Sequence, residues 1–143
     1  MGKPGVEVWN FYKGDIYAGF AYMLLSGRYA YLLFCATPEE LRGQGLGAAI
    51  IRRLTEHYKG RTMVLDIEVI DPSALNAEQR LRRLHFYERL GFALSSYEMT
   101  DETGDYAILT ANAESLDVEA FREMFNILPP IFEGTVIVPA KIR

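Results

Sequence analysis

Three glycines within seven residues form the segment of this sequence best suited to hold an anion. The segment reads Arg42-Gly43-Gln44-Gly45-Leu46-Gly47-Ala48 and lies between an apolar run and an amphipathic one. Glycines let a backbone approach a ligand closely, and a helix start presents unpaired N–H groups with about half a positive charge. A strand, a glycine loop and a helix in this order therefore predict a pocket for pyrophosphate. The segment lacks the Gly-Lys-Ser or Gly-Lys-Thr of a Walker loop and could supply only two of the three glycines of the dinucleotide fingerprint, so ATP and NAD fit poorly. The alternative is a glycine-rich turn that merely starts the helix.

Two carboxylates, Asp66 and Glu68, are candidates for moving protons. They alternate with apolar residues in the run 63–70, so a strand there places both side chains on one face, about 6.5–7 Å apart. Repulsion between the two charges favours proton uptake by one of them, which suits a general base. The alternative is that they pair with arginines of a neighbouring helix. We prefer this alternative for Asp66, and for Glu68 both interpretations stay open.

The remaining reactive side chains suggest less chemistry. Cys35 lies in an apolar run with no histidine near it in sequence, which is typical of an inert thiol. His57 and His85 are interpreted as surface groups. With two histidines and one cysteine in the whole chain, no metal site is expected.

Hydrophobic periodicity predicts the elements that position these residues. Alternation and short turn signals predict three antiparallel strands at 6–12, 16–25 and 29–36, the third covered on both faces. A four-residue period predicts a helix from Leu46 to near Gly60, and a strand follows at 63–70. Gly91 should end a second helix at 76–90. The rest of the chain predicts a hairpin of 92–99 and 106–111 around the polar loop 101–105, a helix at 114–128 ended by Pro129, and a short edge strand at 135–138.

Composition limits the class of protein. The 143 residues suit one domain, residues 1–143, with residues 112–143 appended to its core as a helix and tail. Half of the residues are hydrophobic and the formal net charge is -4, so a globular core is expected and nucleic-acid binding is not. No apolar run reaches the ~20 residues that span a membrane, and no export signal opens the chain. A cytoplasmic protein without disulfides is expected.

A second motif gives the glycine loop its context. Tyr87, Gly91 and Phe92 end the second predicted helix, 40 residues after the loop. Together the two motifs resemble the GNAT family of acyl-CoA-dependent N-acyltransferases. The family's first signature is Gln or Arg, two residues, Gly, one residue, then Gly or Ala, and it is matched by Arg42, Gly45 and Gly47. Its later signature, Tyr-x-x-x-Gly-Phe, is matched by Tyr87, Gly91 and Phe92. The resemblance covers about residues 7–111.

The resemblance implies an α/β fold: a mixed, mostly antiparallel sheet splayed between two central parallel strands, here 29–37 and 63–70, and flanked by helices. Relatives usually begin with a strand and two helices that form one wall of the acceptor site, and this chain lacks them. The wall would come from the C-terminal helix and tail or from a second subunit, or the chain is a shortened product with altered activity; we prefer a homodimer. Where the family often has Asn and Ala, this chain has Arg80 and Arg83.

The same resemblance implies the site residues. Backbone N–H groups of 44–48 would hold the pyrophosphate of CoA, and backbone groups of 34–37 would pair with the pantetheine arm. The implied cofactor-binding residues are Phe34, Cys35, Ala36, Thr37, Arg42, Gly43, Gln44, Gly45, Leu46, Gly47, Ala48 and Tyr87. Tyr87 would donate to the departing thiolate, although a core aromatic is the alternative. A backbone N–H near Cys35 or Ala36 would meet the transient oxyanion.

Glu68 is the candidate base, acting directly or through a water. An alkyl ammonium has a pKa near 10.4, so at pH 7 fewer than ~0.1% of acceptor molecules carry the lone pair needed for attack. The carboxylates favour a cationic acceptor, and Arg80, Arg82 and Arg83 are interpreted as a solvated helix face.

The predicted function is N-acetyl transfer from acetyl-CoA to a primary amine of a small molecule or peptide, by direct attack in a ternary complex. The alternative is a catalytically silent module that binds CoA or dimerises. A third possibility is a GNAT-shaped subunit that binds no CoA.

Overall fold

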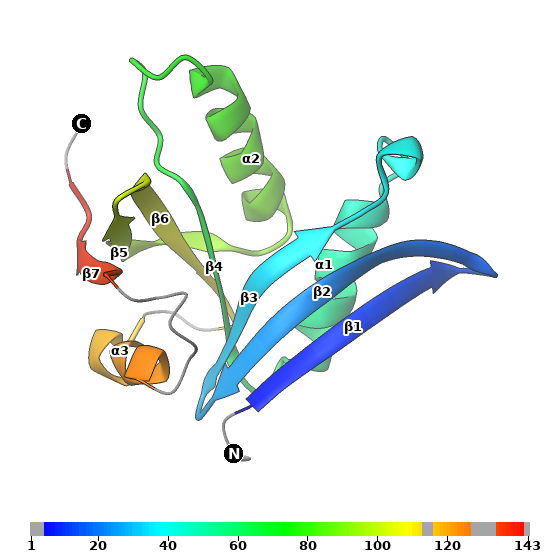
Figure 1. The fold of residues 1–143 in the computed structure, drawn as a ribbon, viewed down its shortest axis with the longest axis horizontal. Coiled ribbons are helices and arrows are strands. Elements are labelled where there is room, and N and C mark those ends of the chain that lie inside the picture. The colour runs from blue at the N-terminus through cyan, green and yellow to red at the C-terminus, as the bar shows by residue number, and fades with distance from the viewer. Residues whose placement is uncertain (1–4, 113–115, 127–133, 142–143) are drawn as a thin grey trace. The chain divides into compact units, whose positions relative to one another are not determined.

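The computed structural model describes residues 5–112, 116–126 and 134–141. Within them, the chain forms a seven-stranded mixed sheet and three α-helices, which confirms the expected α/β fold class (Figure 1). The chain divides into two compact units, residues 1–63 and 64–143. The strand order is β1-β2-β3 in the first unit and β4-β6-β5-β7 in the second.

Three antiparallel strands, a short 3-10 helix (Glu39–Leu41) and one α-helix make up the described part of the first unit. The strands are β1 (Gly5–Lys13), β2 (Ile16–Ser26) and β3 (Tyr29–Ala36), and two-residue turns join them as the turn signals predicted. Helix α1 (Leu46–His57) lies behind this ribbon in Figure 1 and buries Ile50, Ile51 and Leu54, in accord with its sequence period.

The aromatic end of α1 is tied to the edge strand β1. The ring of His57 lies 4.6 Å from that of Trp9, whose Nε1 donates to the hydroxyl of Tyr58 at 2.9 Å. That hydroxyl donates to a carboxylate oxygen of Glu7 at 2.5 Å. Burial, together with the neighbouring Glu7 carboxylate, raises the pKa of Tyr58 to about 12, so the phenol stays protonated and keeps donating.

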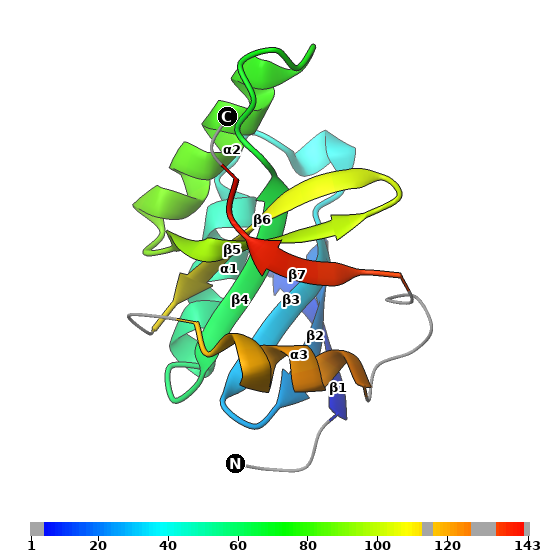
Figure 2. The same ribbon diagram turned by 90° about the vertical axis from the view of Figure 1, so that its left-hand side faces the viewer.

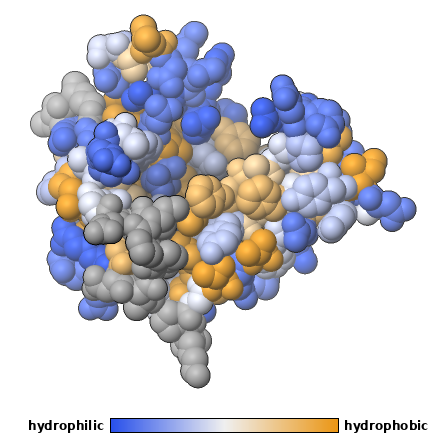
Figure 3. Space-filling model, in the orientation of Figure 1, coloured by the Kyte–Doolittle hydropathy of each residue, from blue (hydrophilic) through white to orange (hydrophobic). Residues whose placement is uncertain are grey.

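The opposite face of the ribbon is apolar and open to solvent. Val8 pairs with Tyr22, which pairs with Phe34, and the side chains of Val8 and Phe34 are 56% and 51% exposed. Figure 3 shows hydrophobic side chains gathered over these strands. The expectation that β3 is covered on both faces is therefore wrong for its second half. Residues 29–32 are buried, whereas 33–36 alternate, because an apolar run alone does not reveal whether its second face is covered.

The second unit holds the remaining strands and helices. They are β4 (Thr62–Glu68), α2 (Ala77–Arg89), β5 (Ala93–Asp101), β6 (Gly104–Ala111), α3 (Val118–Asn126) and β7 (Val136–Pro139). Helix α3 lies beside β7 (Figure 2), where Arg122 Nη2 donates to the carbonyl of Ile137 at 2.9 Å. Phe121 and Met124 of α3 are fully buried. Glu114, Leu128 and Pro129, which bound the predicted third helix, lie outside the described residues.

The hairpin of β5 and β6 is longer than predicted. Asp101 pairs with Gly104, so only Glu102 and Thr103 form the turn, in place of the expected loop 101–105. The carboxylate of Asp101 accepts hydrogen bonds from the backbone N–H of Thr103 at 2.7 Å and from its hydroxyl at 2.5 Å. These bonds lower the pKa of Asp101 and let a polar residue close a tight turn.

Candidate active site

The glycine loop leads into α1 without a side-chain cap. Gly43 and Gly45 have φ of 84° and 76°, a left-handed conformation that favours glycine. Gly45 is the N-cap, and the first intrahelical bond is donated by Ala49 N to Gly45 O at 3.1 Å. The N–H groups of residues 46–48 therefore have no partner within the helix. A Cβ placed on Gly43 or Gly45 meets nothing within 4 Å, so this first turn is open to a ligand.

The second half of β3 precedes this loop in the same unit. Phe34, Cys35 and Ala36 pair with β2, and Cys35 is half-buried. Burial raises the pKa of the Cys35 thiol to about 11. A thiol of that pKa is almost entirely neutral at pH 7, which agrees with its interpretation as an inert residue.

Tyr87 lies in the last turn of α2, in the second unit. Its ring contacts those of Phe86 and Phe92, at centroid distances of 5.1 and 5.8 Å. The helix ends at Arg89, and Gly91 just beyond it has the left-handed φ of +96° that the sequence predicted. Tyr87 also lines a pocket along α2 with a volume of about 440 Å³, together with Gln79, Arg82, Arg83 and Phe86. Tyr87 is therefore a half-buried residue in the wall of a pocket and not a fully enclosed core aromatic.

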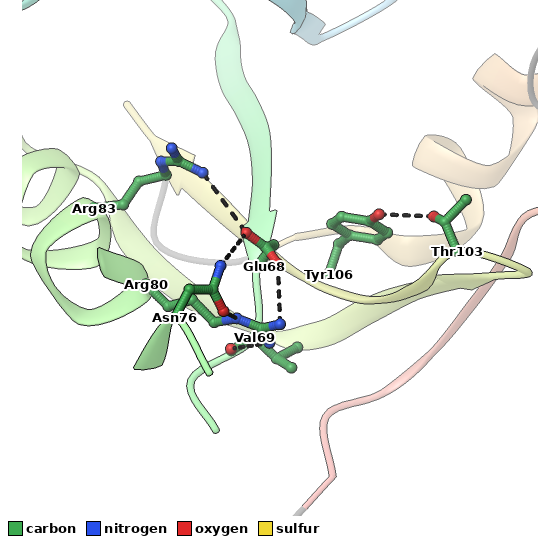
Figure 4. Close-up of polar contacts among 7 residues, drawn as sticks. All are labelled: Glu68, Val69, Asn76, Arg80, Arg83, Thr103 and Tyr106. Carbon is green, nitrogen blue, oxygen red and sulfur yellow. Dashed lines mark hydrogen bonds and ion pairs between the residues drawn. The ribbon is translucent and has the colours of Figure 1, made fainter. Parts of the chain in front are cut away.

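Glu68 ends β4 and is held by side chains from α2 and the residue that precedes it (Figure 4). Arg80 Nη2 lies 3.0 Å from Glu68 Oε2, and Asn76 Nδ2 donates to Oε1 at 3.2 Å. Arg83 reaches Oε1 at 4.0 Å. The pairing with helix arginines, one of the two interpretations left open by the sequence, is therefore present. Asp66 shares the half-buried face of β4 with Glu68, as the alternation predicted.

Arg80 is a structural residue rather than part of a solvated helix face. Its Nε donates to Asn76 Oδ1 at 2.8 Å and its Nη1 to the carbonyl of Val69 at 3.1 Å, and its side chain is only 19% exposed. Sequence reasoning missed Asn76 and the bridging role of Arg80. The signal was the spacing of Asn76, Arg80 and Arg83, which repeats at four and three residues along one helix face.

The structure places the expected site residues in two groups. The residues of β3 and the glycine loop belong to the first unit, and Glu68 and Tyr87 belong to the second. Within the described residues no group of three or more His, Cys, Asp or Glu side chains is arranged to hold a metal ion. None of the helices in that part of the chain is long and apolar enough to cross a membrane.

Residues 4–94 match the family model of the GNAT acetyltransferase domain. The match spans more than half of the chain, and the chain belongs to this family of acetyltransferases. A search of the curated proteins found no match.

Solved structures share the fold. A putative acetyltransferase of the GNAT family from Bacteroides thetaiotaomicron is 26% identical, with a TM-score of 0.65 over 90% of this chain and 73% of its own. A Bacillus subtilis acetyltransferase in complex with CoA is 16% identical, with a TM-score of 0.59 over 76% of this chain and 78% of its own. The ribosomal-protein-S18-alanine N-acetyltransferase from Escherichia coli is 20% identical, with a TM-score of 0.57 over 78% and 72% of the two chains.

Proposed function

We propose that this protein transfers an acetyl group from acetyl-CoA to a primary amine of a small molecule or peptide, by direct attack of the amine on the thioester in a ternary complex. The observation that carries the proposal is the uncapped start of α1. Backbone N–H groups of residues 46–48 lack a partner within the helix. They follow Gly43 and Gly45 in the chain, which are both in the left-handed conformation and have no atom within 4 Å of where a Cβ would lie. A pyrophosphate is the guest that such a helix start favours, and the solved B. subtilis relative is described as a complex with CoA.

The cofactor would be held mainly by backbone. Residues 42–48 would bind the pyrophosphate, and the amide-rich pantetheine arm would pair with the backbone of residues 34–37 as an added strand does. Residues 33–36 in the second half of β3 are partly exposed, which is compatible with this assignment. The neutral thiol of Cys35 would take no part in acyl transfer.

Tyr87 would stabilise the departing CoA thiolate. With pKa values of ~10 for a phenol and ~8.5 for a thiol, full proton transfer is uphill by ~2 kcal/mol, so a hydrogen bond is the expected role. The position of Tyr87 in the wall of the α2 pocket makes its side chain available to a ligand.

Glu68 would accept the ammonium proton through a water. A carboxylate has about four lone-pair sites, and the contacts from Arg80, Asn76 and Arg83 occupy at most three of them. One site therefore remains for a bridging water.

Two measurements test the proposal. Calorimetry with acetyl-CoA should show binding, and a thiol-release assay over a panel of amines should show turnover. Tyr87→Phe should lower kcat at least tenfold with the affinity for acetyl-CoA nearly unchanged, because the phenol acts in the transition state. Equal turnover would remove Tyr87 from the mechanism. Binding without release from any amine would establish a silent CoA-binding module, and no binding would establish a GNAT-shaped subunit. Light scattering of the full chain checks the expected homodimer.

A further inference from the structure

We propose that the α2 pocket, formed by Gln79, Arg82, Arg83, Phe86 and Tyr87, binds a carboxylate carried by one of the two substrates. This inference rests on the proposed function and names the substrate class: an amine acceptor that also carries a carboxylate, or an acyl chain that ends in one. In either case the same carboxylate–arginine contact selects the substrate.

The charge of the pocket is the first argument. None of its five described lining residues is acidic. Within the described part of the chain, Arg82 has no hydrogen-bond or ion-pair partner. Arg83 is 57% exposed and lies 4.0 Å from Glu68, at the limit of an ion pair. Because Arg80 already neutralises Glu68 at 3.0 Å, the pocket keeps an excess of positive charge.

This charge balance bears on the expected cationic acceptor. The preference for a cationic acceptor rested on Asp66 and Glu68 as free carboxylates, but Glu68 is paired, and two guanidinium groups line the pocket beside Tyr87. At the arginine end of the pocket a cationic group would be repelled, whereas a carboxylate would accept hydrogen bonds from both arginines.

The arrangement of the lining residues is the second argument. Gln79, Arg82, Arg83, Phe86 and Tyr87 follow at steps of three, one, three and one, so they form one stripe along α2. The polar end supplies amide and guanidinium donors, and the other end supplies two aromatic rings that suit methylene groups. A volume of about 440 Å³ is that of a small-molecule site.

The length of the stripe sets the length of the ligand. Arg82 and Arg83 precede Tyr87 by five and four residues, which is about 6–7.5 Å along the helix axis at ~1.5 Å per residue. A ligand with about five carbon atoms between its carboxylate and its reacting group spans this axial distance, with C–C bonds of ~1.5 Å. The probe of matching length is 6-aminohexanoate.

The first experiment measures thiol release from acetyl-CoA with 6-aminohexanoate, 1-aminohexane and 1,5-diaminopentane. If the acceptor carries the carboxylate, kcat/KM should be about tenfold higher for 6-aminohexanoate than for the diamine. Arg82→Gln and Arg83→Gln should each remove most of that preference by raising KM for 6-aminohexanoate. The readout is the ratio of kcat/KM values between the two substrates, because Arg83 also contacts the candidate base Glu68. Arg89→Gln is the matched control, because Arg89 is exposed on the same helix and does not line the pocket.

The second experiment identifies the source of the carboxylate. With 1-aminohexane as acceptor, pimeloyl-CoA, in which about five methylenes separate the carboxylate from the thioester, is compared with acetyl-CoA in the wild type and in the same variants. A preference for pimeloyl-CoA that Arg82→Gln reduces places the carboxylate on the acyl chain. If neither arm shows a preference that depends on Arg82 or Arg83, the inference is overturned.

The third experiment separates this inference from the proposed function. Glutarate is titrated into the full chain while the backbone amide NMR signals of α2 are followed. Shifts that saturate in the wild type, with affinity at least about fivefold lower in Arg82→Gln, support the pocket even if no amine is acetylated. If acetyl transfer proceeds but glutarate produces no shifts and neither kinetic arm responds, the carboxylate site is refuted and the proposed function stands.

Discussion

Arg80 joins the end of β4 to α2, and its removal should measurably destabilise the second unit. Arg80→Met keeps most of the aliphatic stem and deletes the guanidinium group, which contacts Glu68 Oε2 at 3.0 Å, Asn76 Oδ1 at 2.8 Å and the carbonyl of Val69 at 3.1 Å. With Arg80 only 19% exposed, these groups lose a partner that solvent replaces only in part.

The expected loss follows from these contacts. Breaking a fully buried ion pair costs about 3–5 kcal/mol, whereas an exposed pair contributes about 0–1 kcal/mol. The side chain of Glu68 is 36% exposed, which places the pair between these limits. Solvent replaces part of the contact, and Arg83 at 4.0 Å supplies a weak second partner. We therefore expect the free energy of unfolding to fall by about 2–3 kcal/mol.

Urea denaturation followed by circular dichroism measures this loss. Arg82→Met is the matched control, because Arg82 lies on the same helix, is exposed and should change stability by no more than about 0.5 kcal/mol. A double-mutant cycle of Arg80→Met with Glu68→Gln should give a coupling of about 1–2 kcal/mol. An Arg80→Met variant as stable as the Arg82→Met control would show that the bridge contributes nothing and would refute this reasoning.

Three further predictions concern other parts of the chain. Gly45→Ala should lower the free energy of unfolding by about 1 kcal/mol, because Gly45 has a left-handed φ of 76°, and should weaken acetyl-CoA binding measured by calorimetry. Gly45→Asn should fold more easily, because Asn tolerates that conformation. Unchanged affinity in both variants would argue against the loop as the pyrophosphate site. Burial raises the pKa of Cys35 from 9.0 to about 11, so at pH 8 the thiolate is about 100-fold scarcer in the folded protein than in the unfolded chain. The higher nucleophilicity of a thiolate with a higher pKa offsets about tenfold of this difference. Iodoacetamide should therefore react with the folded protein at least about tenfold more slowly than with the protein unfolded in urea. The stabilising contribution of that raised pKa is complete below pH 9 and is lost as the pH rises through 11, so an alkaline titration of stability should fall in this window, and equal alkylation rates would contradict the buried thiol. Phe121→Ala should lower stability by about 3–5 kcal/mol, because this side chain is fully buried and contacts Phe125 at a ring distance of 5.4 Å; a loss below 1 kcal/mol in urea denaturation would contradict its core role.

Periodicity was sufficient to locate most elements. The predicted helix at 76–90 is α2 at Ala77–Arg89, and the predicted strand at 135–138 is β7 at Val136–Pro139. Their hydrophobic patterns and Gly91 act locally, so they are readable without tertiary information. The length of the β5–β6 hairpin could not be predicted, because Asp101 and Asp105 are typical turn residues. Only the strand pairing of Asp101 with Gly104 and of Thr100 with Asp105 shows that both extend the strands.

In the candidate site, too, some residues could be located from the sequence and the state of others could not. The glycine loop and the Tyr87 motif are local sequence features, so the sequence was enough to locate them. The state of Glu68 was not local: its partners lie 8 and 12 residues further along the chain, and their contact depends on how α2 lies against β4. The prediction that Arg80, Arg82 and Arg83 form a solvated helix face was wrong for Arg80 for the same reason. When one side of a polar helix is buried, no pattern of hydrophobic residues in the sequence reveals it.

Position 19 limits how β2 and β3 can vary together. Gly19 has φ of +149°, and a Cβ added there would lie 2.4 Å from the carbonyl oxygen of Ala36 and 3.3 Å from a methyl carbon of Thr37. Any side chain at this position must push the last residues of β3 outward, since a backbone oxygen cannot rotate away as a flexible side chain can. If the backbone of residues 34–37 binds the pantetheine arm as proposed, a substitution at Gly19 in β2 should lower the affinity for acetyl-CoA from outside the proposed binding residues.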